Sequence, residues 1–369
     1  MKKLSRTIAF ALALFTGTVE ATATESDPGF IELGTFFRGQ PEERAKFEAF
    51  DRLVQAPAVP LGIQRDEPLQ IHVIYPGLQV SDYWHRSVQS FSARMDEIGI
   101  SHEITSLFTK SAFDIRLQMN AIGRVLREKP DFLVFTLDAL RHKGMVSRVL
   151  ASGHTKVILQ NITTPLTGLG PPDPLLYVGF DHEFGTRMLT DEFIHRSPKG
   201  ARYAIFYGTV GYVSRMRGVT FRQAIEDRTE FELVGEYYVG FDRGRAREAA
   251  RELLKRDPGI SFIYAASTDI AHGVADAIGE YGLRGKVMVN GWGGGGSELD
   301  AIRKGELDFT VMRMNDDNGV AMAEAIRLTM EGRAESVPRV YSGAFALIDQ
   351  QTPDATLERL IDRAFRYSR

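Results

Sequence analysis

A repeated alternation of short apolar runs and amphipathic segments is the feature that most constrains the fold of this chain. From Ile71 to Phe180, and again from Tyr203 onward, a run of strand length is followed by a segment with helical spacing of its apolar residues. Strands connected by helical crossovers predict parallel sheets with helices on both faces. Because 369 residues is too long for one ordinary core, the two runs predict two α/β domains.

The predicted strands cover Ile71–Tyr75, His102–Phe108, Phe132–Leu137, Lys156–Asn161, Leu175–Phe180, Tyr203–Tyr207, Glu232–Gly240, Phe262–Ala266, Lys286–Asn290, Phe309–Met314 and Tyr341–Leu347. The predicted helices cover Pro41–Gln55, Tyr83–Ile98, Asp114–Glu128, Gly144–Ala151, Arg215–Arg228, Arg245–Arg256, Ile270–Tyr281, Ser297–Lys304, Gly319–Met330 and Leu357–Tyr367.

The N-terminal residues have the pattern of a secretory signal peptide. Three basic residues within the first six positions precede the apolar run Thr7–Phe15, and small residues allow cleavage after Ala21 or Ala23. The alternative, a membrane anchor, is disfavoured because a bilayer span needs about 20 apolar residues. We therefore expect an exported protein that is not itself membrane-spanning, with the periplasm as its location.

Composition and motifs exclude several classes of function. With 45 basic and 48 acidic residues, the chain lacks the excess of positive charge that favours binding to nucleic acid. It has no cysteine, which removes thiol nucleophiles, iron–sulfur clusters and cysteine-type zinc sites. The eight histidines include no metal-binding pair, and neither a P-loop nor a GxSxG elbow is present.

Polar and aromatic residues follow the predicted strands where they end. Ligands of open α/β sheets bind outside the carboxyl ends of the strands, so these positions are the candidate site: Gln79, Ser81, Trp84, Asn161, Arg217, Thr268, Asp269, Trp292 and Arg313. Aromatic rings, amides and hydroxyls suit a compact polyhydroxylated ligand. Two arginines against one aspartate indicate that the ligand is partly anionic.

Several of these polar residues have a structural alternative in helix capping. Thr268 or Asp269 could be the N-cap of the helix that follows, and Gln79 and Ser81 could cap the helix that begins near Asp82. The coincidence of so many polar groups at strand ends favours a binding site.

The aromatic and basic residues also have structural alternatives. Trp84 and Trp292 could be ordinary packing residues, and Arg217 could lie on a solvated helix face. Arg313 stands alone in an apolar strand, where an unpaired charge is unfavourable, unless it pairs with Asp316–Asp317.

The glycine-rich segment Gly291–Gly296 formally matches the GxGxxG pattern of dinucleotide sites. It occurs late in the chain and contains Trp292, where a pyrophosphate would need a small residue. We therefore do not predict dinucleotide binding.

The chain resembles type I periplasmic binding proteins and, more narrowly, the periplasmic autoinducer-2 receptors of the LuxP type. The matching segments span nearly all of the chain after the leader: Tyr75–Trp84, Phe135–Lys143, Val157–Pro165, Tyr177–His182, Met216–Phe221, Tyr264–Asp269, Asn290–Gly295, Val311–Asp317 and Arg363–Ser368. It departs from the family before Pro60, over Leu166–Pro174 and over Glu331–Pro338.

The resemblance implies two doubly wound parallel-sheet lobes around a ligand cleft, joined by three crossovers near Gly179, near Met314 and near Val337–Ser342. The expected division is then a signal peptide (1–23), an extension (24–68), a first lobe (69–178 and 315–337), a second lobe (179–314 and 338–350) and a C-terminal helix (351–369).

The resemblance also implies a function. The ligand would be autoinducer-2, a furanosyl borate diester, so that boron arrives as part of the ligand and no cofactor is needed. By motif match, Gln79, Ser81, Trp84 and Asn161 would line the cleft from the first lobe. Arg217, Thr268, Asp269 and Trp292 would do so from the second, with Arg313 beside a crossover, and the two arginines would offset the borate charge.

The partner implied by the resemblance is the periplasmic domain of a LuxQ-type sensor histidine kinase. The alternative is a periplasmic sugar-binding protein of an ABC importer with a ribose-like ligand. We do not expect an enzyme, because the predicted cleft has one acid, no histidine and no cysteine.

Overall fold

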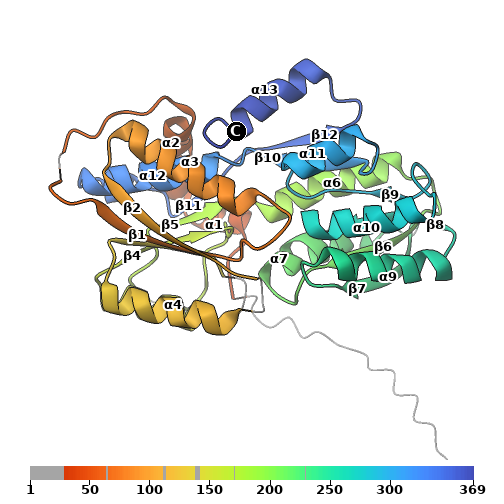
Figure 1. The fold of residues 1–369 in the computed structure, drawn as a ribbon, viewed down its shortest axis with the longest axis horizontal. Coiled ribbons are helices and arrows are strands. Elements are labelled where there is room, and N and C mark those ends of the chain that lie inside the picture. The colour runs from red at the N-terminus through yellow and green to blue at the C-terminus, as the bar shows by residue number, and fades with distance from the viewer. Residues whose placement is uncertain (1–28, 64, 111–113, 138–141, 170, 229) are drawn as a thin grey trace, which may run out of the picture.

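The computed structural model describes residues 29–63, 65–110, 114–137, 142–169, 171–228 and 230–369. The predicted signal peptide (1–23), its cleavage positions and residues 24–28 of the predicted extension lie outside this range. Figure 1 shows two α/β lobes side by side, each with a mostly parallel sheet, which confirms the predicted fold class.

The sheet of the first lobe has the strand order β11-β5-β4-β3-β1-β2, and all of its neighbouring strands are parallel. Its strands are β1 (Leu69–Tyr75), β2 (His102–Phe108), β3 (Phe132–Phe135), β4 (Lys156–Gln160), β5 (Leu176–Gly179) and β11 (Val340–Ser342). Its helices are α3 (Tyr83–Ile98), α4 (Ile115–Glu128), α5 (His142–Ser152) and α12 (Asp317–Met330), and the short 3₁₀ helix η2 (Ala334–Ser336) follows α12.

The two faces of this sheet bury alternate side chains. Phe132 and Val134 of β3 lie in one core cluster, with residues of α3 and α12, whereas Leu133 and Phe135 lie in another, with residues of α4 and α5. Because side chains alternate along a strand, a strand covered on both faces reads as a continuous apolar run. The short apolar runs of the sequence have this pattern, and their alternation with amphipathic segments was the basis for predicting the parallel sheet.

The second lobe combines a parallel sheet with an antiparallel pair. Strands β6 (Arg202–Tyr207), β7 (Glu232–Tyr238), β8 (Ile260–Ala265) and β9 (Met288–Val289) have the order β7-β6-β8-β9, and β10 (Phe309–Arg313) pairs with β12 (Phe345–Asp349). The helices are α6 (His182–Arg196), α7 (Tyr212–Ser214), the π-helix η1 (Arg215–Val219), α8 (Thr220–Glu226), α9 (Arg243–Arg256), α10 (Thr268–Glu280) and α11 (Gly296–Arg303).

The chain crosses between the lobes after β5, after β10 and between β11 and β12. The third crossover corrects the prediction: Val340–Ser342 belongs to the first sheet, where β11 pairs with β5, and not to the second lobe. The predicted strand Tyr341–Leu347 is therefore two strands, broken at Gly343, where a Cβ would lie 2.6 Å from the Phe180 ring. Since β10 leaves the second lobe where β12 re-enters it, the two strands run antiparallel.

The extension and the C-terminal segment both bind the first lobe. Helices α1 (Leu33–Gly39) and α2 (Pro41–Gln55) pack on it, and Phe50 and Val54 of α2 enter its core. Helix α13 (Asp354–Ala364) packs on the second lobe, and Figure 1 shows it above the junction of the lobes. Beyond α13, the backbone N–H groups of Tyr367 and Ser368 donate to the Asp316 carboxylate of the first lobe, at 2.7 and 3.0 Å.

No helix in the described part of the chain has the length and apolar composition needed to cross a membrane.

Candidate ligand-binding site

A cavity of about 60 Å³ lies between the lobes. A single water needs about 10–15 Å³ of such accessible space, so the cavity suits a compact molecule. All nine predicted site residues line it, and so do Pro76, Tyr83, Thr136, Leu137, Thr209, Gly211, Tyr212, Val213, Phe241 and Ser267. The structure thus brings the nine residues together, and their binding of a ligand stays a prediction.

The wall from the first lobe rests on a buried hydrogen-bond network. The Tyr75 hydroxyl donates to Gln160 Oε1, and Gln160 Nε2 donates to Ser87 Oγ at 2.9 Å and to the Tyr83 hydroxyl at 3.3 Å. Asn318 Nδ2 also donates to the Tyr83 hydroxyl, at 2.6 Å. Since buried polar groups that are all paired hold one arrangement, this network fixes the Tyr83 ring against the cavity.

Asn161 and Trp84 complete this wall. Asn161 follows β4 with φ at 63°, a left-handed conformation that non-glycine residues seldom adopt. Its Oδ1 is buried and has no hydrogen-bond partner in the described part of the protein, which leaves it available to a ligand donor. The Trp84 ring packs on the rings of Tyr75 and Tyr83 at 4.7 and 4.8 Å between centroids, so it is both a core residue and part of the cavity wall.

Arg217 is buried, with 5% of its surface exposed, so the alternative that it lies on a solvated helix face is wrong. It lies on η1, and single π-helical turns recur at functional sites. Its Nε donates to His182 Nδ1 at 3.3 Å and its Nη1 to the Ala266 carbonyl at 2.9 Å. Its guanidinium lies 3.5 Å above the Trp292 ring.

Arg313 is as buried as Arg217, and it has no acidic partner among the described residues. Its guanidinium lies 4.0 Å from the centre of the Tyr83 ring, and its Nε is buried without a hydrogen-bond partner. The alternative that it pairs with the following acids is wrong: Asp316 accepts from the C-terminal segment, and Asp317 pairs with Arg366 at 3.2 Å.

Burial destabilises the charge of both arginines, and Arg313 adds to this effect at Arg217. Burial lowers the pKa of Arg217 to about 9, with the positive charge of Arg313 as the next cause. Burial also lowers the pKa of Arg313. The cavity is therefore an electropositive, desolvated space, in which a negative charge on a ligand would be stabilised.

Asp269 joins the two lobes across the mouth of the cleft. Its Oδ1 accepts from the Val80 backbone N–H at 2.9 Å, and burial raises its pKa. The alternative that it is the N-cap is wrong, because Ser267 Oγ accepts from Ile270 N at 3.4 Å and occupies that role. A second contact across the mouth runs from Gly296 N to Asp82 Oδ2, at 3.2 Å.

The remaining predicted hydroxyl and amide groups have weaker contacts of their own. Thr268 Oγ1 donates to the Trp292 carbonyl at 3.4 Å. Ser81 Oγ accepts from the backbone N–H of Tyr83, the first residue of α3, at 3.5 Å. Of the two residues proposed as caps of this helix, Ser81 therefore makes a contact with its first turn. Gln79 is half-buried at the cavity.

The glycine-rich loop is organised by Glu298, a buried acid that the sequence reasoning missed. Its carboxylate accepts from Trp292 N at 3.0 Å, from Gly294 N at 2.8 Å and from Thr310 Oγ1 at 2.6 Å. The glycines make room for the neighbouring strand: a Cβ at Gly293, where φ is 140°, would lie 2.5 Å from an Arg313 nitrogen.

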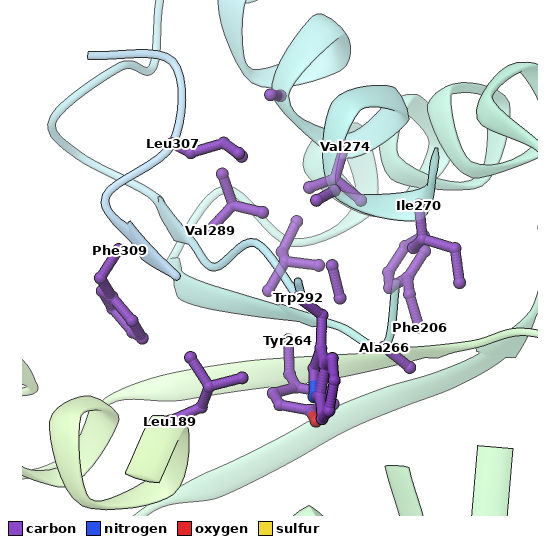
Figure 2. Packing of buried hydrophobic residues seen from close by; sticks show 14 of the residues in the cluster. Leu189, Phe206, Tyr264, Ala266, Ile270, Val274, Val289, Trp292, Leu307 and Phe309 are labelled. Carbon is purple, nitrogen blue, oxygen red and sulfur yellow. The ribbon is translucent and has the colours of Figure 1, made fainter. Parts of the chain in front are cut away.

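Trp292 has both of the roles that the sequence left open. It is fully buried and belongs to the core of the second lobe, where Figure 2 shows its ring beside Tyr264. The ring also forms part of the cavity wall, and the guanidinium of Arg217 lies over it.

Several cavity residues were missed for identifiable reasons. Thr136 directly follows β3 and Thr209 closely follows β6, so the strand-end rule would have found both. Phe241 lies in the loop after β7 and Tyr212 begins the short helix α7, and no sequence signal places either in the cavity. Metal binding was not predicted, and the described residues contain no cluster of three or more acids and histidines that could hold an ion.

Comparison with known proteins identifies the family. The model of the periplasmic binding protein domain matches residues 71–334. The D-allose-binding periplasmic protein of Escherichia coli is 30% identical over 154 residues, 41% of this chain and 49% of that protein. The ribose import binding protein RbsB of Salmonella typhimurium is 24% identical over 180 residues, 48% of this chain and 60% of that protein. The chain thus spans about half to three fifths of the length of these relatives.

Solved structures share the fold. A glucose-galactose binding protein from Geobacillus stearothermophilus superposes with a TM-score of 0.68 at 18% identity, over 78% of this chain and 100% of that one. A periplasmic ribose ABC transporter protein from Conexibacter woesei gives 0.65 at 20% identity, over 82% and 97%. With a family match over most of its length and two lobes around a cavity, this chain belongs to the periplasmic binding protein domain family.

Proposed function

We propose that this chain binds a compact, cyclic, polyhydroxylated solute of the sugar class between its lobes, in the periplasm. The observation that carries the proposal is the cavity between the lobes, to which both lobes contribute hydroxyl, amide, aromatic and guanidinium groups. Such clefts close around their ligand, and the ligand stabilises the closed form by contacting both lobes at once.

Two ligands fit this class. The first is a neutral aldose, delivered to an ABC importer. The relatives support it most directly, since their names concern D-allose and ribose import. The hydrogen-bonding groups of the first lobe match sugar hydroxyls.

The second is autoinducer-2 as its furanosyl borate diester, with occupancy relayed to a LuxQ-type sensor histidine kinase. What supports it is the charge of the cleft: Arg217 and Arg313 are both buried there without an acidic partner in the described chain. A neutral sugar leaves these cations uncompensated, whereas an anionic ligand between them would offset their charge.

Titration calorimetry separates the two. The purified protein is titrated with D-ribose, D-allose and autoinducer-2, each with and without borate. Binding of an aldose in borate-free buffer supports import, whereas binding of autoinducer-2 only with borate, together with a boron-11 NMR signal from the complex, supports the receptor. If none of these ligands binds, the sugar-class proposal is wrong.

We also propose that the bound ligand is not converted. The acid of the cavity, Asp269, is engaged by Val80, and paired carboxylates for acid–base catalysis are not among the lining residues. Recovery of the ligand unchanged after prolonged incubation with the protein tests this, and a new product would contradict it.

A further inference from the structure

His182 stands behind the cavity wall and was not among the predicted site residues. It is the first residue of α6, reached directly after the first crossover from β5, and only 1% of its surface is exposed. Its ring lies between those of Trp292 and Tyr212, at 5.4 and 5.7 Å between centroids. Both neighbours line the cavity, although His182 itself does not.

The two ring nitrogens of His182 contact two residues of the candidate site. Nδ1 lies 3.3 Å from Arg217 Nε, and Nε2 lies 3.2 Å from the Asn161 carbonyl oxygen. A guanidinium can only donate and a carbonyl can only accept. Both contacts are therefore hydrogen bonds only if His182 is neutral, with its proton on Nε2.

The surroundings of His182 favour this neutral form. Arg217 approaches it from η1 and Arg313 from β10, and both positive charges act with burial to lower its pKa well below the ordinary value. The phenol of Tyr212 faces it from α7. On its own helix, the Asp181 carboxylate is occupied as the N-cap, accepting from Glu183 N and Phe184 N.

The contacts of His182 also cross the boundary between the lobes. Asn161 belongs to the first lobe and Arg217 to the second, so the imidazole joins one site residue of each. The Asn161 backbone that it binds is the one held at positive φ.

We propose that His182 is a positioning residue. Its neutral Nε2–H form orients the Arg217 guanidinium toward the cleft, and this orientation depends on the hydrogen bond between the lobes from His182 to Asn161. Arg217 Nε–H is then oriented by the histidine and Nη1 by the Ala266 carbonyl, which leaves the remaining N–H groups of the guanidinium for the ligand. The expected effect on ligand affinity rests on the proposed function, but the tautomer of His182 and the ordering of Arg217 do not.

The first test uses the ligand-free protein. In protein labelled with ¹⁵N-histidine and ¹⁵N-arginine, we expect at neutral pH one histidine resonance pair of the Nε2–H tautomer that disappears in His182→Phe. We also expect a slowly exchanging Arg217 Nε–H signal that is lost in the same variant. A His182 that carries its proton on Nδ1, or is protonated at neutral pH, would overturn the proposal.

The second test measures affinity for autoinducer-2 with borate and for D-ribose. His182→Phe keeps the ring volume but removes both hydrogen bonds, so we expect roughly a 10-fold loss for the anionic ligand and a smaller loss for the neutral one. His182→Gln, a neutral side chain that can accept and donate, should restore part of the affinity. Equal losses for both ligands without rescue by glutamine would reduce His182 to a packing residue.

His102→Phe is the matched control. His102 is also largely buried and also makes two hydrogen-bonding contacts, to Ser92 Oγ and the Ile100 carbonyl at 2.8 Å each, but it lies on β2 away from the cavity. This variant should leave both affinities and the Arg217 signal unchanged. If no ligand binds even to the wild type, the proposed function fails, while the NMR result still decides the role of His182.

Discussion

The wall that the first lobe gives to the cleft is neutral, whereas the wall of the second lobe carries its charges. On the first side, Tyr83 is held by a network whose members are paired within that lobe. On the second side, Arg217 and Arg313 are buried with only neutral acceptors or an aromatic ring beside them. The Tyr83 side of the first wall is therefore held in place without a ligand, and Asn161 Oδ1 is left as a neutral acceptor, whereas the second wall has unbalanced charge.

This difference assigns separate tasks to the two lobes. A preorganised neutral wall recognises shape and hydroxyl positions at little cost in ordering, because its side chains are already fixed. The charged wall is stabilised only when a ligand brings opposite charge or strong acceptors. We expect substitutions in the two walls to differ in sign as well as in size.

The largest effect is expected on ligand affinity. Replacing Arg217 or Arg313 by alanine should weaken binding of an anionic ligand by about 2–5 kcal/mol, because each removes a buried charge-assisted partner. Calorimetry with autoinducer-2 and borate measures this. Arg284→Ala, an exposed arginine paired with Glu306 on the same lobe, is the control and should bind normally. Near-normal affinity in both cleft variants would contradict the charged-wall interpretation.

The next effect concerns pH and a paired charge of the first lobe, outside the cleft. Burial raises the pKa of Asp317 to about 6, despite its pairing with Arg366. Between pH 3.8 and about 6, the Asp317 carboxyl is therefore mostly protonated in the folded protein. In the unfolded chain it is ionised above its ordinary pKa of 3.8. The stability from this proton is complete below that value and is lost as the pH rises through about 6.

Comparing the free energy of unfolding of the wild type with that of Asp317→Asn at several pH values isolates this effect. Relative to the variant, the wild type should lose about 3 kcal/mol in total as the pH rises from about 3 to about 7. A constant difference across that range would show that the carboxyl titrates as an exposed one.

A smaller effect is expected from breaking the neutral wall. Gln160→Leu leaves the Tyr75 hydroxyl and Ser87 Oγ without their partner, which should destabilise the protein by about 2 kcal/mol, as unsatisfied buried groups do. Urea denaturation without ligand measures it. Gln70→Leu, on an exposed position of the same sheet, should change stability by no more than about 0.5 kcal/mol.

The smallest effect has the opposite sign. Arg313→Met removes a buried cation that lacks an acidic partner, so the ligand-free protein should become more stable by about 1 kcal/mol. Arg94→Met gives the contrast, because buried Arg94 pairs with Glu324 Oε1 at 2.7 Å and its loss leaves that oxygen without its partner, while Oε2 keeps only Arg327. If both variants are destabilised alike in urea denaturation, Arg313 is a structural residue and the two walls do not differ as described.

The sequence predicted the sheets, the cavity and nine of its residues because each depends on a local pattern. Apolar runs mark strands, and residues just after strands meet at one edge of a sheet. Asp269 was found by this rule, but not its contact with Val80, since that contact joins segments far apart in the sequence.

The break at Gly343 was missed for a related reason. The segment Tyr341–Leu347 reads as one strand, and only the pairing of β11 with β5 and of β12 with β10 shows that it is divided between the two lobes. The absence of an acid beside Arg313 also needed the structure, because two acids follow it closely in the chain and turn out to bind other groups.

The late return of the chain to the first lobe has a consequence for folding order. Strand β11 closes the edge of the first sheet, β12 pairs with β10 in the second lobe, and Ser368 binds the start of α12. Each contact needs residues after 339, and that of β11 joins them to β5, a strand made far earlier in the chain. Neither lobe can complete its packing until nearly the whole chain has emerged, so we expect the two lobes to finish folding together, at a rate limited by these distant pairings.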